Sequence, residues 1–226
     1  MNILFGNYGN HTIALVQWAY EFGLENVTVV NIHTGWHAEH WPARVLSGKA
    51  LCARYGFQTQ ELEAPESFTE LTLERGRLPT AKFQWCTTFL KAMPLLAWLD
   101  EIDPSCNAII QLGARRQDSR ARYDLPAEID ANDYYGGRCV KYPLVDHDNT
   151  NFKALIERSG QELLTTPSQE CAPCIHSNPT NLSCQDQQRW RNLLKQIDAT
   201  DTLVTPKNES LEQFDRGCGS HYACGE

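Results

Sequence analysis

The sequence has no run of about 18 apolar residues, and its amino terminus, MNILFGNYGN, has neither a basic segment nor a long apolar one. The first absence argues against a membrane-spanning helix, and the second argues against a secretory signal. A composition of 42% hydrophobic and 21% charged residues in 226 also excludes a collagen-like or fully disordered chain. We therefore expect a soluble cytoplasmic protein, with no membrane partner, built around one sizeable core.

Positive charge is scarce as well. Twenty Lys and Arg stand against 28 Asp and Glu, which gives a net charge of −8. Residues 198–226 hold six acidic and two basic side chains, a net of −4. A chain this acidic should not bind polyanions over its whole surface. If a nucleic acid is involved, we expect it to be recognised through partner subunits.

Cysteine, in contrast, is abundant, with nine in the chain. Structural disulfides are rare in the cytosol, so metal ligation or thiol chemistry is the leading explanation. Cys52 and Cys106 are interpreted as small packing or surface residues without a further role.

Short apolar runs alternate with helical periodicity in the first half of the chain. This pattern predicts strands at 2–5, 27–33, 58–63 and 108–112 and helices at 12–22 and 42–55. Strand–helix alternation of this kind predicts an α/β fold, with a parallel twisted sheet and helices on both faces. Ligands then belong at the carboxyl ends of the strands.

The pattern weakens after about residue 118. Residues 124–151 read as polar and loop-like, with a possible short strand at 142–145. Helices are predicted at 150–159 and 183–197, and a cysteine-bearing loop lies between them.

The segment FGNYGNHT, residues 5–12, joins the first predicted strand to a helix. Its backbone N–H groups and the helix dipole can cradle a phosphate. The segment lacks the Lys-Ser/Thr of a Walker A loop and the GxGxxG spacing. An ordinary tight turn is the alternative interpretation.

Two further segments carry basic side chains that could contact a phosphate. QWCTTFLKAMPL, residues 84–95, places Cys86 and Lys91 near the start of a helix, where a lysine can neutralise a phosphate and a cysteine can ligate a metal. GARRQDSRAR, residues 113–122, has four arginines in eight residues directly after a strand. Such a loop favours an anion clamp, with a solvated charged loop as the alternative.

A CxxC pair is formed by Cys171 and Cys174, and Cys184 follows ten residues later. Thiolates at this spacing can bind one metal or cluster from a tight turn. The remaining ligands must come from elsewhere, and Cys184 and Cys86 are the natural candidates. A redox pair is the alternative, although a thioredoxin-like pair opens a helix after a first strand, whereas this pair lies in a late loop.

These segments occur in the order typical of the adenine nucleotide alpha-hydrolase family, which includes phosphoadenosine phosphosulfate reductases and N-type ATP pyrophosphatases. Residues 113–122 resemble its G-x-R-x-x-[DE]-S-x-x-R signature, and CTTFLKAMPL resembles C-[ST]-x-x-x-K-x-x-P-[LM]. His33-Thr34-Gly35 resembles its D-T-G, with His in place of Asp, and ECAPCIHSN resembles the cysteine loop of its cluster-bearing members. The resemblance covers about residues 1–190 and includes the DNA phosphorothioation ATP pyrophosphatases.

The loop at residues 5–12 departs from the family pattern. The typical loop reads S-G-G-x-D-S, or F-G-G-G-x-N-S-T in phage-like members, whereas here two glycines and the serine are replaced. Asn10 and Thr12 keep hydrogen-bonding groups in place. The resemblance therefore favours nucleotide binding more strongly than hydrolysis.

The resemblance implies a nucleotide-binding domain over residues 1–197, including the cysteine loop at 171–184, and an acidic flexible tail over 198–226. Phosphates are expected against residues 6–12, and the adenine and ribose over the ends of the first two strands, where the Ile32 backbone can read the adenine edge. The expected nucleotide-binding residues are Phe5, Gly6, Asn7, Gly9, Asn10, Thr12, Ile32, Thr34, Gly35, Gly113 and Ser119. The expected catalytic residues are Lys91, Arg115, Asp118 and Arg122.

The resemblance to cluster-bearing relatives also favours one four-thiolate site with a [4Fe–4S] cluster, and zinc is the alternative. Its expected ligands are Cys86, Cys171, Cys174 and Cys184. Cys139 is the substitute for Cys184. Cys218 and Cys224 are left out, because a glycine-rich tail is a poor scaffold for a rigid site.

The function implied is an ATP pyrophosphatase-type enzyme that adenylates an acceptor, a DNA backbone phosphate, for sulfur insertion. Mg²⁺ would bridge the phosphates of ATP, and the sulfur would come from a donor such as a cysteine desulfurase. The alternatives are a reductase of phosphoadenosine or adenosine phosphosulfate, a tRNA thiolation enzyme, and a non-catalytic nucleotide-sensing subunit.

Overall fold

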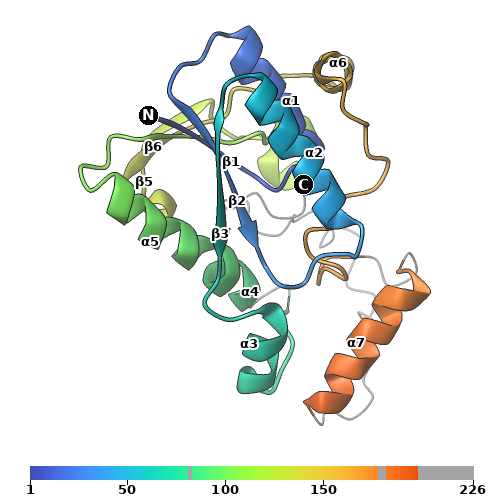
Figure 1. Ribbon diagram of the computed structural model, residues 1–226. Coiled ribbons are helices and arrows are strands. Elements are labelled where there is room, and N and C mark those ends of the chain that lie inside the picture. Colours follow the sequence, from blue (N-terminus) through green and yellow to red (C-terminus); the bar gives the residue numbers. More distant parts are fainter. Residues whose placement is uncertain (81–82, 178–181, 198–226) are drawn as a thin grey trace.

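A computed structural model of the protein describes residues 1–80, 83–177 and 182–197 (Figure 1). The predicted acidic tail at 198–226, with Cys218 and Cys224, lies outside the described residues. Among the residues described, no helix combines the length and the apolar character needed to cross a bilayer.

Six strands form one sheet in the order β3-β2-β1-β4-β6-β5. The strands are β1 (Asn2–Phe5), β2 (Val27–His33), β3 (Gln58–Glu63), β4 (Ile109–Gln111), β5 (Glu128–Asn132) and β6 (Arg138–Lys141). Neighbouring strands from β3 to β6 are parallel, whereas β5 pairs antiparallel with β6. The carboxyl ends of β1, β2, β3 and β4 therefore meet at one edge of the sheet.

Helices cover both faces of the sheet, as predicted (Figure 1). The helices are α1 (Asn10–Glu21), α2 (Trp41–Arg54), α3 (Phe68–Arg75), α4 (Trp85–Thr87), α5 (Met93–Ile102), α6 (Asn149–Ser159) and α7 (Cys184–Gln196). A π-helical turn, η1 (Thr88–Ala92), joins α4 to α5, and Pro94 stands in the first turn of α5, where its missing N–H costs nothing.

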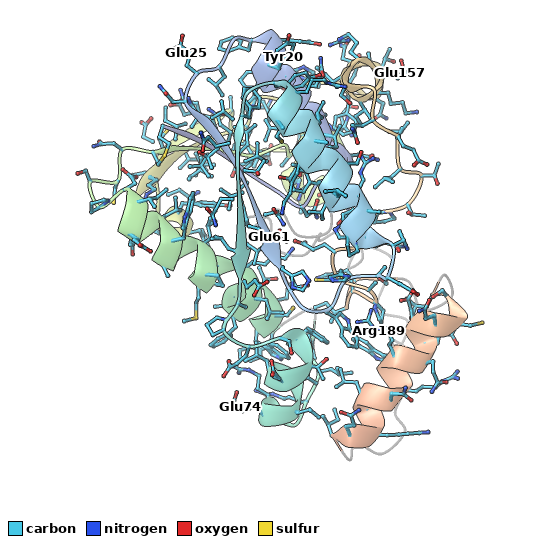
Figure 2. The ribbon with its side chains drawn as sticks, viewed as in Figure 1. Tyr20, Glu25, Glu61, Glu74, Glu157 and Arg189 are labelled. Carbon is cyan, nitrogen blue, oxygen red and sulfur yellow. The ribbon has the colours of Figure 1, made fainter. Side chains whose placement is uncertain are left out.

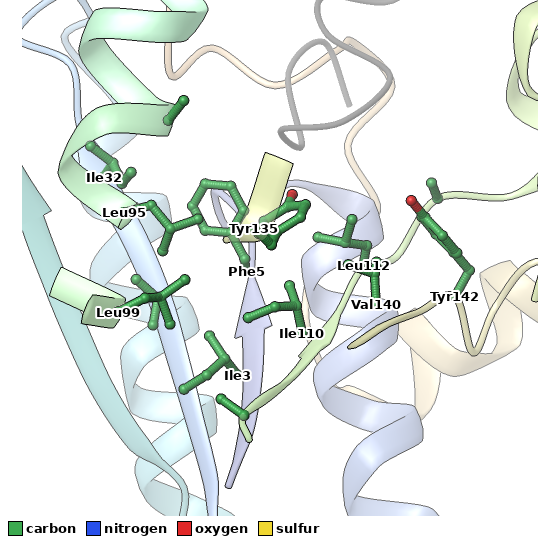
Figure 3. Close-up of a cluster of buried hydrophobic side chains, with 14 of the residues drawn as sticks. Ile3, Phe5, Ile32, Leu95, Leu99, Ile110, Leu112, Tyr135, Val140 and Tyr142 are labelled. Carbon is green, nitrogen blue, oxygen red and sulfur yellow. The ribbon is translucent and has the colours of Figure 1, made fainter. Parts of the chain in front are cut away.

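The alternation of side chains along each strand builds two cores. Ile3 and Phe5 of β1 face α5 and pack with Leu95 and Leu99 (Figure 3). Leu4, between them, points to the other face, where α1, α2 and α6 cover the sheet. Successive side chains of a strand point to opposite faces, so β1 is buried on both sides and reads as a continuous apolar run.

The strands that come from the second half of the chain differ from the sequence prediction. β5 and β6 lie within the stretch 124–151 that was expected to be loop-like. The strand expected at 142–145 is wrong: these residues follow β6 and are not in a strand. Because β5 runs antiparallel, the sheet is mixed rather than entirely parallel.

Arg138 explains why β6 was missed. Its side chain is fully buried, although a charged residue in RCVK suggests an exposed loop. Its guanidinium donates to Asp103 Oδ2 at 2.9 Å and to the backbone oxygens of Leu99 and Asp103 at 3.0 and 2.7 Å. A buried cation is tolerated only with such partners, and these come from the distant end of α5, which local sequence cannot reveal.

A third cluster lies beyond the carboxyl edge of the sheet. Trp36, Phe68 of α3, Trp85 of α4 and Leu193 of α7 pack together there. Figure 1 shows α3, α4 and α7 gathered at that end of the molecule. Arg189 of α7 points back towards the sheet domain and donates to the backbone oxygens of His37 and Ala172, each at 2.8 Å (Figure 2). The cluster fixes the cysteine loop against the sheet edge.

Candidate functional site

A cavity of about 510 Å³ opens at the carboxyl ends of β2 and β3, beside α2. This volume lies within the range of small-molecule sites in proteins. The residues that line it are Asn7, Asn31, Ile32, His33, Thr34, His37, Trp41, Pro42, Val45, Leu46, Lys49, Glu61, Glu63 and Glu170. We call this space the strand-edge cavity.

The loop between β1 and α1 borders the strand-edge cavity. Its backbone is held by its own side chains: the Asn7 N–H donates to Thr12 Oγ1 at 3.0 Å, and the Gly9 N–H donates to Asn7 Oδ1 at 2.8 Å. α1 begins at Asn10 with no side-chain cap. The first-turn N–H groups of a helix have no partners within the helix, so this end of α1 can receive an anion.

Two glycines allow this loop to be tight. A Cβ at Gly6 would lie 2.0 Å from Thr12 Oγ1, and a Cβ at Gly113, after β4, would lie 2.7 Å from the backbone oxygen of His11. Both glycines therefore serve close packing around the amino end of α1. Gly113 brings the arginine loop against that end.

We predict that Gly113→Ala lowers the free energy of unfolding by about 1–3 kcal/mol, because the added methyl group forces the His11 backbone away. Urea denaturation measures the change. An unchanged free energy of unfolding in Gly113→Ala would contradict the prediction.

The sequence reasoning missed two buried polar groups of the strand-edge cavity. Asn31 is 3% exposed, and its Oδ1 has no hydrogen-bond partner among the described residues. Trp41 is also 3% exposed, and the same holds for its indole Nε1. Buried groups of this kind normally have a partner, so this acceptor and this donor are available to a polar ligand in the cavity. The Trp-Pro pair that opens α2 gave no signal of this role.

The outer rim of the cavity carries opposite charges. Lys49 of α2 pairs with Glu61 of β3, which Figure 2 labels beside that helix. Partial burial tends to raise the pKa of Glu61, but the contact with Lys49 outweighs it and lowers the pKa below its usual value. Glu61 is therefore ionised at neutral pH.

Lys91 and Glu170 form a buried ion pair beside the cavity. Their side chains are 4% and 9% exposed, and Lys91 Nζ contacts Glu170 Oε2. The same oxygen lies 3.5 Å from Asn7 Nδ2, in the loop that precedes α1. The expected phosphate-binding lysine therefore already faces a carboxylate, which the sequence did not suggest.

The predicted anion clamp is built around Asp118. Arg115 Nε and Nη2 lie 2.9 and 2.8 Å from Asp118 Oδ1, and Arg122 Nη1 lies 3.3 Å from Oδ2. His11 Nε2, from the first turn of α1, lies 3.0 Å from Oδ2. The Arg115 guanidinium also stacks on the Phe152 ring at 3.9 Å. The arrangement ties the arginine loop to α1 and α6.

The electrostatics of this cluster favour ionised Asp118. Burial alone would raise the pKa of Asp118, but the contact with His11 and the charge of Arg115 lower it from 3.8 to about 2. Arg115 uses its remaining Nη1 on Asn149 Oδ1 and the His147 backbone oxygen, at 3.1 and 3.3 Å. Arg115 is thus oriented by the protein, and a direct phosphate contact remains a prediction.

Three of the four expected metal ligands meet at a second, much smaller pocket. Cys86, Cys171 and Cys174 line it together with Lys91 and Thr34. Trp36 closes this cysteine pocket: its Nε1 donates to the Pro173 oxygen at 3.0 Å. The pocket has about 20 Å³ of free volume, roughly the room for one water molecule.

In the described part of the chain, the cysteine pocket therefore has the donor atoms of a metal site but not the arrangement needed to coordinate a metal. Within the described ranges, no group of three or more His, Cys, Asp and Glu is arranged to hold a metal ion. Cys184 is exposed at the start of α7 and does not line the cysteine pocket. Three thiols that line one pocket have the donor atoms that iron–sulfur clusters and zinc prefer. The four-thiolate site stays a prediction, and Cys139 lies elsewhere, on β6.

Only some of the other predicted nucleotide-binding residues line the strand-edge cavity. Asn7, Ile32 and Thr34 line the strand-edge cavity. Phe5 is buried in the core on the α5 side of the sheet, and Asn10 exchanges hydrogen bonds with the Leu164 backbone at 2.8 and 2.9 Å.

Gly35 and Ser119 have local backbone roles in the structure. Gly35 has a φ of 68°, and a Cβ there would lie 2.8 Å from Ser67 Cβ. Ser119 separates two 3₁₀ turns and accepts from the Arg122 N–H at 3.0 Å.

Solved structures support the same fold. The phosphoadenylyl-sulfate (PAPS) reductase of Candida auris, solved with phosphate, is 16% identical, with a TM-score of 0.53 over 71% of this chain and 73% of that one. The U34-tRNA thiolase NcsA of Methanococcus maripaludis, solved with its [4Fe–4S] cluster, is 10% identical, with a TM-score of 0.54 over 100% of this chain and 80% of that one. At these identities the likeness concerns the fold alone.

Sequence comparison gives the family. A curated relative, the uncharacterized 37.8 kDa protein in the gpa 5′ region of Escherichia phage 186, is 27% identical over 150 residues. The alignment covers 61% of this chain and 43% of the phage protein, so the chain spans less than half the length of that relative. The model of the phosphoadenosine phosphosulfate reductase domain matches residues 2–165, which include the loop before α1, Lys91 and the Asp118 cluster. On this match, the chain belongs to the phosphoadenosine phosphosulfate reductase domain family.

Proposed function

We propose that the chain is an ATP pyrophosphatase-type enzyme, which adenylates an acceptor so that sulfur can be inserted. The observation that carries the proposal is the junction between two pockets. Thr34 lines both the strand-edge cavity and the cysteine pocket, and the Lys91–Glu170 pair lies between them. A nucleotide-sized cavity thus adjoins three thiols, as sulfur insertion on an activated substrate requires.

The adenosine of ATP would occupy the strand-edge cavity near Ile32 and Thr34. The unpartnered Asn31 Oδ1 can accept from a ligand, and the Trp41 Nε1 can donate to one. The phosphates would then extend past Asn7 to the amino end of α1. The helix dipole and the first-turn N–H groups stabilise negative charge there.

The chemical step is an attack on the α-phosphorus. An acceptor oxygen forms a bond to that phosphorus, the bond to the bridging oxygen breaks, and pyrophosphate leaves with the electron pair. Lys91 and the amino end of α1 can stabilise the charge that develops on the leaving group. Mg²⁺, when bound, would neutralise phosphate charge.

The cysteine pocket is the part of the site to which we assign the receipt of sulfur. Cys86, Cys171 and Cys174 would hold a [4Fe–4S] cluster, or zinc as the alternative, and the cluster would supply a site at which sulfur is received. A donor such as a cysteine desulfurase would deliver the sulfur. The thiolase with its [4Fe–4S] cluster has the same fold, which supports this assignment.

We propose a DNA backbone phosphate as the acceptor. The net charge of −8 disfavours direct binding of a polyanion, so partner subunits would present the DNA. tRNA is the alternative acceptor and would require an RNA-binding partner of its own.

The family match favours a second candidate, a reductase of phosphoadenosine or adenosine phosphosulfate. That reaction needs a nucleophilic thiol that attacks the sulfate sulfur and displaces the nucleotide phosphate. A second thiol then attacks the cysteine sulfur of the adduct, which releases sulfite and leaves a disulfide for the thiol reductant to reduce. The two candidates differ in substrate and product, so one assay separates them.

Incubation of the full chain with ATP, Mg²⁺ and candidate acceptors is expected to release pyrophosphate and to form an adenylated acceptor. Parallel incubations supply phosphoadenosine or adenosine phosphosulfate with a thiol reductant. Sulfite release without pyrophosphate release would favour the reductase. ATP binding without either product, in the presence of acceptor and partners, would favour a nucleotide-sensing subunit.

A further inference from the structure

The contacts of Glu170 reach both pockets. Its carboxylate meets Lys91, which lines the cysteine pocket, and lies 3.5 Å from Asn7 in the loop before α1. Its backbone oxygen accepts from Thr34 Oγ1 at 3.0 Å. The next residue in the chain is Cys171, whose Sγ lies 3.7 Å from the same Thr34 hydroxyl. Glu170 therefore links the Lys91 ion pair to the backbone of the segment that carries Cys171.

The Glu170 carboxylate lies beside the position that the loop and helix end offer to an anion. The side chain is 9% exposed, so water screens its charge poorly. A polyphosphate placed against Asn7 would bring several negative charges next to this carboxylate. Juxtaposed like charges in a contact are strongly unfavourable, and both groups would compete for the Lys91 ammonium.

We propose that Glu170 is a positioning residue that holds Lys91 before nucleotide binds and is displaced from it by the phosphates, which moves the segment carrying Cys171 and Cys174. The inference rests on the proposed function, because it requires a nucleotide in the strand-edge cavity. It goes beyond that function by making the cysteine segment responsive to the phosphates of the nucleotide.

The backbone around Glu170 gives the proposal a direct reporter. The Ala172 N–H donates to the Trp36 oxygen at 2.8 Å, and the Ala38 N–H donates to the Gln169 oxygen at 2.9 Å. These two bonds hold residues 169–172 against the loop after β2. If phosphates displace Glu170, these bonds should open more often and their amide hydrogens should exchange faster.

The test combines ATP affinity with hydrogen exchange on the full chain as purified. Glu170→Gln keeps the size and polarity of the side chain but removes the competing charge, so it should bind ATP at least ~10-fold more tightly than the wild type. ATP should accelerate exchange of the Ala38 and Ala172 amide hydrogens of the wild type. In Glu170→Gln, exchange of these amides should already be fast without ATP and should change little on its addition.

Glu157→Gln is the matched control, because Glu157 is exposed on α6 (Figure 2) and its loss changes the net charge by the same amount. It should leave both measurements unchanged. The peptide containing β5 and β6 serves as the internal exchange reference, and circular dichroism of both variants verifies folding.

The outcomes separate this inference from the proposed function. Equal ATP affinity in the wild type and Glu170→Gln would overturn the role of Glu170 while leaving nucleotide binding intact. Unchanged exchange of the Ala38 and Ala172 amides when the wild type binds ATP would overturn it without any variant, so the test survives misfolding of Glu170→Gln. Failure of both proteins to bind ATP, AMP and inorganic pyrophosphate would contradict the proposed function and this inference together.

Discussion

Replacing Asp118 by asparagine is expected to lower the free energy of unfolding by about 3–5 kcal/mol at neutral pH, the usual effect of breaking a buried ion pair by removing one partner. The Asp118 side chain is 8% exposed, and Arg115 and Arg122, at 7% and 8%, lie beside it. Asparagine keeps the shape but leaves two buried guanidinium groups without their counter-ion. Urea denaturation measures the loss, and Asp124→Asn, at an exposed position, is the matched control.

The effect of Asp118→Asn on the free energy of unfolding is expected to depend on pH. The pKa of Asp118 falls from 3.8 to about 2 on folding, so the carboxylate stabilises the protein fully above about pH 4. This contribution disappears as the pH falls from 3.8 towards 2, because the carboxyl group of the unfolded chain then takes up a proton while the native carboxylate stays ionised. The stability difference between the wild type and Asp118→Asn should therefore narrow below pH 4. A constant difference down to pH 2 would contradict the proposed ionisation.

Lys91→Met is expected to lower the rate of pyrophosphate release by about 10²–10³-fold, the usual effect of removing one group that stabilises developing charge. The substitution also leaves the Glu170 carboxylate buried without its cation, which should lower stability. Steady-state kinetics and thermal unfolding measure the two effects.

A double variant separates these effects of Lys91. Lys91→Met combined with Glu170→Gln replaces the ion pair by two uncharged side chains, so stability should recover while the rate should not. Recovery of the rate in the double variant would mean that the loss in Lys91→Met came from the unpaired carboxylate, and it would remove Lys91 from the chemistry.

The first three strands were predictable because local sequence decides them. β1, β2 and β3 have the bounds expected from their residues. The first two are rich in apolar or β-branched side chains that are buried between layers, and glycines or polar residues bound them. The amphipathic helices α1 and α2 follow for the same reason, with ends that differ from the prediction by two residues or fewer.

The missed features depend on partners far away in the sequence. β6 depends on the pairing of Arg138 with Asp103 at the end of α5, 35 residues earlier. The contact between Lys91 and Glu170 spans 79 residues, and neither residue type suggests a buried pair by itself. The motif residues predicted the regions of the site, whereas the neutralisation of Lys91 and the unpartnered Asn31 and Trp41 atoms became visible only in three dimensions.

The cysteines show the same division. Cys171, Cys174 and Cys86 line one pocket, and their binding to one metal stays a prediction. Cys184 opens α7, directly after its N-cap Ser183, and is exposed. The number of residues between Cys174 and Cys184 does not determine whether Cys184 reaches the pocket.

The central claim, that the strand-edge cavity binds an adenine nucleotide, is tested most directly by calorimetric titration of ATP into the full chain. Val45 of α2 lines the cavity, and Val45→Phe should fill part of it and weaken ATP binding at least ~10-fold through steric exclusion and repacking. Leu73→Phe, at an exposed position on α3, is the matched control and should leave the affinity unchanged. We expect one ATP per chain in the wild type and the control; equal affinity in Val45→Phe, or no binding by the wild type, would contradict the claim.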